Sequence, residues 1–205
     1  MNNLTKRTTR HEEIRKMVLA AILIAIIVLM TFIPEIGYIT IGLVPITIIH
    51  IPVIVGGILL GRKYGLILGF VFGLGSMTKS FMEYTVNAPF TNPLLSVVPR
   101  SFVGLIASDI YALFTKVIHR EKLAVPLALG TVTFIHSLIV LPLLYWVWKS
   151  GFFFFTEEFI FALDKKLFPF IWGTFVANSL FEIALAILIG TPLVIVLEIL
   201  KKNQK

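Results

Sequence analysis

The chain has 205 residues, of which 58% are hydrophobic and 14% are charged, and its formal net charge is +7. Soluble domains are about 25% charged, so this composition excludes a soluble enzyme or binding domain and indicates an integral membrane protein. The sequence has no cysteine, which excludes disulfide bonds, thiolate metal sites and a cysteine nucleophile.

Six long apolar stretches follow one another along the sequence. A helix needs about 20 apolar residues to cross the hydrocarbon core, because each residue rises about 1.5 Å. Four or five stretches meet this length on their own, and the third meets it if it continues to about Met82. We therefore predict one all-α membrane domain over residues 1–205. Its six transmembrane helices are expected at about 17–33, 43–60, 64–82, 98–118, 123–148 and 171–200.

Basic residues are distributed unevenly among the connections between these stretches. Of the 18 Lys and Arg residues, 13 precede the first stretch, follow the last, or lie in or beside the second-to-third and fourth-to-fifth connections, and 5 lie in or beside the other connections. Because positively charged segments stay in the cytoplasm, we predict that both termini are cytoplasmic. The basic excess then reflects this orientation and attraction to anionic lipid, and needs no nucleic-acid partner.

Glycines recur every four residues across the second and third stretches, at Gly57, Gly61, Gly65, Gly69 and Gly73. Such ridges let helix backbones approach closely in a membrane, where packing replaces the hydrophobic drive that lipid does not supply. We expect this ridge to pack the second and third spans against a neighbouring span.

A shorter pattern of small residues, Ala21-xxx-Ala25, lies in the first span among Ile, Leu and Val. Two interpretations stay open on the pattern alone. The patch could face into the bundle, or it could dock a partner membrane protein.

Strongly polar side chains inside apolar stretches are costly, so they usually line a cavity or pair with one another. Arg100 opens the fourth span, Asp109 lies nine residues further on, and His136 lies midway along the fifth. Asn178 and Glu182 are four residues apart in the sixth span and therefore share one helix face. This shared face favours a position lining a pocket.

Structural interpretations of the same residues also stay open. Arg100 could reach the lipid headgroups from the outer end of its helix. Glu182 is expected to be protonated or to pair with Arg100, Lys79 or His136. His50 and His136 could be hydrogen-bonded packing residues, and Asp109 could be a buried acceptor or lie near the inner half of the membrane.

The stretch from Ile46 to Gly69, with His50-Ile-Pro52 followed by Gly61-Arg-Lys-Tyr-Gly65, resembles the substrate-binding S components of energy-coupling factor vitamin transporters. Asn92-Pro-Leu-Leu-Ser-Val-Val-Pro-Arg100 is similar to the entry into the fourth helix of that family. The size, the six helices and the Ala-xxx-Ala pattern also fit. The His-Ile-Pro-Val variant is most similar to the pantothenate-specific members.

This resemblance implies a transport mechanism in the prokaryotic plasma membrane. S components bind a vitamin in an outward-facing pocket and deliver it inward together with a transmembrane scaffold subunit and two cytoplasmic ATPases. Ala21 and Ala25 match the small-residue motif that contacts the scaffold. The sequence has no Gly-x-x-x-x-Gly-Lys-Ser/Thr loop, so we expect the chain not to hydrolyse ATP itself.

Pantothenate has one carboxylate, an amide and two hydroxyls, so its pocket needs a cation, groups that match the amide, and apolar walls. Arg100 can hold a carboxylate bidentately, and Asn178 can pair with an amide or hydroxyl. Glu182 can accept from the hydroxyls but repels a nearby carboxylate, and it suits an aminopyrimidine or a cationic vitamin better. We expect neither a cofactor nor a metal. The candidate substrate-binding residues are Arg100, Asn178, Glu182, His136, Asn87, Tyr84, Asn92 and Tyr38.

Alternatives from three classes remain. The same family includes proteins for other ligands, such as the thiamine precursor hydroxymethylpyrimidine. A stand-alone channel or secondary transporter is a second class, although no inverted repeat is visible between the halves. An intramembrane enzyme using His136, Glu182 and Asp109 is a third, but neither His-Glu-x-x-His nor Gly-x-Ser-x-Gly occurs in the sequence.

Overall fold

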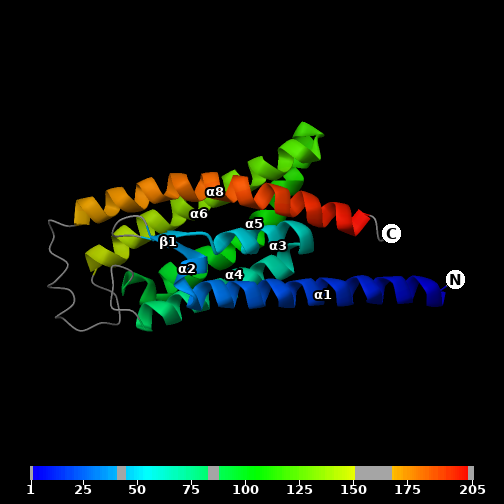
Figure 1. Cartoon of the computed structure of the whole chain (residues 1–205), viewed down its shortest axis with the longest axis horizontal. Coiled ribbons are helices and arrows are strands. Elements are labelled where there is room, and N and C mark those ends of the chain that lie inside the picture. Colours follow the sequence, from blue (N-terminus) through cyan, green and yellow to red (C-terminus); the bar gives the residue numbers. More distant parts are fainter. Residues whose placement is uncertain (1, 41–44, 83–87, 151–167, 203–205) are drawn as a thin grey trace.

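The computed structural model describes residues 2–40, 45–82, 88–150 and 168–202, and it is an elongated helical bundle with one small hairpin (Figure 1). The N- and C-termini lie at the same end of this bundle. The elements in chain order are α1 (Asn2–Phe32), α2 (Pro34–Gly37), β1 (Tyr38–Thr40), β2 (Pro45–Thr47), α3 (His50–Leu60), α4 (Arg62–Met82), the 3₁₀ helix η1 (Ala88–Thr91), α5 (Pro93–Ile118), α6 (Glu121–Ser150) and α8 (Phe168–Lys202).

Five helices are long and apolar enough to cross a membrane among the residues that the structure describes: α1, α4, α5, α6 and α8. The prediction of membrane-spanning helices is confirmed for these five. The third predicted span continues to Met82, as its length requires. Helix α1 begins well before its apolar part, so its basic N-terminal residues lie on a helical extension.

The second predicted span, 43–60, differs from the structure. Its helix α3 begins at His50 and has 11 residues, which gives a length of about 16 Å. Residues Pro45–Thr47 instead form β2, which pairs antiparallel with β1 in the register Tyr38↔Thr47. Proline has no backbone N–H and β-branched residues favour strands, so Pro45-Ile-Thr47 suits an edge strand. The expectation of a purely α-helical chain is therefore wrong at this hairpin.

Helix α3 is apolar because it lies inside the protein. Every residue in it except Leu59 is buried, and a helix that is apolar on all sides belongs in a core. Its side chains pack with residues of α5, α6 and α8 in the largest described cluster, which includes Ile54, Val103, Leu129 and Val194.

The glycine ridge packs α4 against α5, and this part of the sequence analysis is confirmed. A methyl group built on Gly65 would overlap the Gly104 carbonyl, and one built on Gly69 would overlap the Arg100 carbonyl. Gly73 is similarly close to the Val97 backbone. Only glycine permits this approach, and the approach fixes where Arg100 sits.

This geometry predicts a stability difference between two glycine-to-leucine substitutions. Gly69→Leu should lower the free energy of unfolding by about 1–3 kcal/mol, because the added side chain must push α5 away from α4. Gly173→Leu, in α8, is the matched control, since a Cβ added there meets nothing within 4 Å. Thermal unfolding in detergent measures both variants, and an equal decrease for the two would contradict the packing role.

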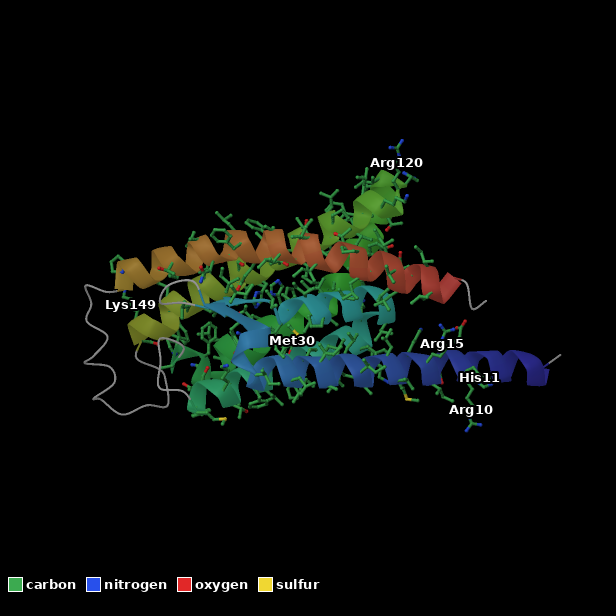
Figure 2. All side chains as sticks on the ribbon, in the orientation of Figure 1. Arg10, His11, Arg15, Met30, Arg120 and Lys149 are labelled. Carbon is green, nitrogen blue, oxygen red and sulfur yellow. The ribbon has the colours of Figure 1, made fainter. Side chains whose placement is uncertain are left out.

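The three labelled arginines lie at the end of the bundle that carries both termini, and the cytoplasmic location of this end stays a prediction. Figure 2 shows Arg10 and Arg15 on the N-terminal part of α1, and Arg120 at the junction of α5 and α6. All three lie at the end of the bundle that carries both termini, whereas Lys149 lies at the opposite end. At the Arg120 end, Arg62 Nε donates to both carboxylate oxygens of Asp109 at 2.8 Å. This ion pair is exposed, so its contribution to stability is small.

Candidate functional site

A cavity lies between the hairpin and four of the long helices, at the half of the bundle away from the termini. Its walls come from β1, β2, α4, η1, α5, α6 and α8, and its polar lining includes Lys79, Arg100, His136, Asn178 and Glu182. The cavity volume is about 70 Å³, whereas pockets that hold small molecules measure roughly 300–1,000 Å³. The lining side chains must therefore move apart before a ligand of vitamin size can bind.

Arg100 is the most deeply placed cation of the cavity. Its side chain is 6% exposed, and its Nη1 donates to the carbonyl oxygens of Leu95 at 3.2 Å and Ser96 at 2.8 Å. The guanidinium carbon lies 4.7 Å from the ring centroid of Phe72 and 5.1 Å from that of Phe90. Cation–π contacts hold an arginine in place at a desolvated site. Arg100 is thus turned into the bundle, and in this structure it does not reach toward headgroups.

Lys79 is a second cation on the wall, and the sequence analysis did not propose it as a site residue. Its Nζ donates to the Thr31 carbonyl at 3.4 Å and lies 4.1 Å from the centroid of the Tyr38 ring. Lys79 lies near the end of the third predicted span, 64–82, where a basic side chain could equally reach the membrane surface. The extension of α4 to Met82 brings it one further turn along the helix and into the cavity.

Glu182 and Asn178 both line the cavity from α8, as their four-residue spacing predicts. The Oε1 atom of Glu182 accepts a hydrogen bond from the Thr47 backbone N–H at 2.9 Å. This bond ties strand β2 to α8. Whether Glu182 is protonated or paired with Arg100, Lys79 or His136 stays a prediction.

Two histidines meet at the inner part of the cavity. The rings of His50, at the start of α3, and His136, midway along α6, are stacked with centroids 6.2 Å apart and planes 15° apart. His136 lines the cavity, whereas His50 is not part of the lining, stacks on the ring of His136 and is 1% exposed. The interpretation as packing residues stays open for His50, whose ring lies close to the backbone of Thr47 and Glu182, whereas both ring nitrogens of His136 have no hydrogen-bond partner among the described residues.

The remaining candidates are distributed differently. Tyr38 lines the cavity from β1. The Asn92 side chain accepts from the Leu94 N–H at 2.9 Å and caps α5, which is a common role for asparagine before a helix. Tyr84 and Asn87 fall outside the described residues.

The lining offers groups of both charges, with two cations against the one carboxylate of Glu182, and this excess of positive charge suits a small polar anion. Arg100 and Lys79 offer positive charge, Phe72 and Phe90 offer apolar surface, and the side chains of serines from α4, α6 and α8 offer hydroxyl groups. The described residues contain no group of three or more His, Cys, Asp or Glu side chains that could hold a metal ion. The arrangement can bind and orient a ligand.

Ala21 and Ala25 lie far from this cavity, on the exposed face of α1. Their large neighbours Met17, Val18 and Ile22 are each more than half exposed, at 53%, 54% and 51%. Of the two interpretations that the sequence left open, the structure excludes the one in which this patch faces into the bundle.

Comparison with known proteins adds a family and two relatives. Residues 15–194 match the family model described as the substrate-specific component of the ECF transporter. The pantothenic acid transporter PanT of Lactococcus lactis subsp. cremoris is 28% identical over 174 residues, which cover 77% of this chain and 80% of that protein. The pantothenate transporter PanT of Leuconostoc mesenteroides subsp. mesenteroides is 32% identical over 102 residues, which cover 47% of this chain and 50% of that protein.

Proposed function

Because this chain belongs to the family of substrate-specific components of ECF transporters, a family of multi-pass cell-membrane proteins, we propose that it binds pantothenate for ATP-driven import. The names of its two relatives support this ligand. Binding occurs from the outside, and delivery inward requires a scaffold subunit and two cytoplasmic ATPases. The chain serves as the binding subunit, since its sequence has no phosphate-binding loop with a following Lys-Ser or Lys-Thr.

One observation carries the choice of ligand: Arg100 is buried and lines the cavity with its Nε unpartnered among the described residues. A buried guanidinium is favourable when it binds an anion. Pantothenate supplies one carboxylate. Its amide and hydroxyls then fall among the serine, asparagine and histidine side chains of the lining.

Glu182 is the residue that favours the alternative ligand, hydroxymethylpyrimidine, because a carboxylate binds an aminopyrimidine well. The hydrogen bond from Thr47 gives Glu182 a different role. Glu182 holds the hairpin against α8. Its negative charge would repel a ligand carboxylate bound at Arg100.

Glu182→Gln separates these two roles. The amide oxygen can still accept from Thr47, while the negative charge is gone, so pantothenate affinity should stay the same or rise about twofold to fivefold. Hydroxymethylpyrimidine affinity should fall if that compound is the true ligand. Isothermal titration of the purified protein measures both. Glu182→Ala, which also removes the acceptor, should weaken pantothenate binding through loss of the hairpin contact.

The orientation proposed for this function places both termini in the cytoplasm. Cysteines introduced at Asn3 and Asn203 should react only with membrane-permeant thiol reagents in intact cells, because the chain has no cysteine of its own. Labelling of either position by an impermeant reagent would show that this terminus lies outside and would contradict the proposed topology.

A ligand screen tests the function itself. The purified protein is titrated with each B vitamin and with hydroxymethylpyrimidine, and pantothenate should bind with the highest affinity. Uptake is then measured in cells with and without the scaffold and ATPase genes. Uptake by this chain alone would favour a secondary transporter. Tighter binding of hydroxymethylpyrimidine than of pantothenate would show that hydroxymethylpyrimidine is the ligand.

A further inference from the structure

The rings of His50 and His136 form a buried stack, and of the two only His136 lines the cavity. The two side chains are 1% and 8% exposed, and both ring nitrogens of His136 have no hydrogen-bond partner among the described residues, whereas His50 lies close to the backbone of Thr47 and Glu182. Buried polar groups in folded proteins nearly always have a partner. The two nitrogens of His136 therefore indicate a place in the cavity where a polar molecule binds.

The cations and His136 line the same cavity but offer different chemistry to a ligand. Arg100 and Lys79 carry positive charge, and Lys79 lies against Tyr38 of the hairpin. The imidazoles instead offer hydrogen bonds. A neutral imidazole has one donor and one acceptor nitrogen, which matches a hydroxyl group, since a hydroxyl also donates and accepts.

We propose that the imidazole pair forms a subsite for the hydroxyl-bearing end of the ligand, with His136 in direct contact with it and His50 as a positioning residue. This inference rests on the proposed function. His136 lines the cavity and can reach the ligand, whereas His50 lies behind its ring. The near-parallel stack fixes the plane of the His136 ring, and with it the direction of its nitrogens.

His136→Phe tests the contact by keeping a flat ring of similar size and removing both nitrogens. Its affinity is measured for pantothenate and for an analogue in which both hydroxyls are replaced by hydrogen. Pantothenate should bind about tenfold more weakly, and the dideoxy analogue should change by less than about twofold. His11→Phe, on the exposed part of α1, is the matched control and should leave both affinities unchanged.

His50 is tested by a pair of variants. His50→Phe keeps the stacking surface, so it should weaken pantothenate by less than about threefold. His50→Ala removes that surface, so the ratio of its affinity for pantothenate to its affinity for the dideoxy analogue should fall about as far as in His136→Phe. If His50→Phe abolishes the preference as fully as His136→Phe does, His50 contacts the ligand itself and the positioning role is wrong.

The outcomes separate this inference from the proposed function. If the wild-type protein does not bind pantothenate, the proposed function fails. Suppose that the wild-type protein binds pantothenate, but His136→Phe lowers its affinity for pantothenate and for the dideoxy analogue equally, or changes neither affinity. Then only the hydroxyl subsite is overturned. Unchanged binding of the dideoxy analogue by the variants also shows that they remain folded.

Discussion

Arg100→Ala is expected to weaken pantothenate binding about 30- to 150-fold. The substitution removes a charge-assisted hydrogen-bonded pair worth roughly 2–3 kcal/mol. Arg100→Lys should recover part of the affinity, because an ammonium cannot reproduce the bidentate guanidinium fork. In the structure the guanidinium lies between Phe72 and Phe90, so a lysine also loses the planar contact with both rings.

Pantothenol, the alcohol analogue without the carboxylate, is the control for this variant. It should bind wild type and Arg100→Ala about equally weakly, which confines the loss to the acid and shows that the variant is folded. Arg120→Ala removes an exposed arginine at the opposite end of the bundle and should leave both affinities unchanged. Unchanged pantothenate affinity in Arg100→Ala would falsify the assignment of Arg100 to the carboxylate.

The double variant Ala21→Trp, Ala25→Trp is expected to abolish vitamin uptake and co-purification with the scaffold subunit. Both alanines lie on the exposed face of α1, where small residues let another helix approach closely. Two indole rings would hold that helix several ångströms away. Ligand binding to the isolated chain should survive, because neither residue is near the cavity.

Ala112→Trp is the matched control for the docking surface. Ala112 is also exposed, but it lies on α5, so its substitution should leave uptake and co-purification near the wild-type level. Uptake at the wild-type level in the Ala21, Ala25 double variant would refute the docking role, and equal loss in Ala112→Trp would show that any added bulk impairs the complex.

Much of the architecture follows from the sequence, because local patterns report the chemistry of each segment directly. Apolar length predicts the five spanning helices, and the four-residue glycine spacing predicts the close approach between α4 and its neighbour. The shared face of Asn178 and Glu182 follows from helical geometry alone. Each of these inferences needs only residues that are near one another in the chain.

The tertiary structure decides features that depend on distant partners. Apolarity reports avoidance of water, and lipid and protein interior are equally apolar, so the sequence cannot distinguish a spanning helix from the buried α3. Lys79 is turned into the cavity, where it lies against Tyr38 of the hairpin, and Glu182 accepts a hydrogen bond from Thr47, 135 residues away in the sequence. The His50–His136 stack likewise joins two helices that only the packed bundle brings together. Such long-range pairs depend on how the helices pack, and packing is not encoded in the spacing of any single segment.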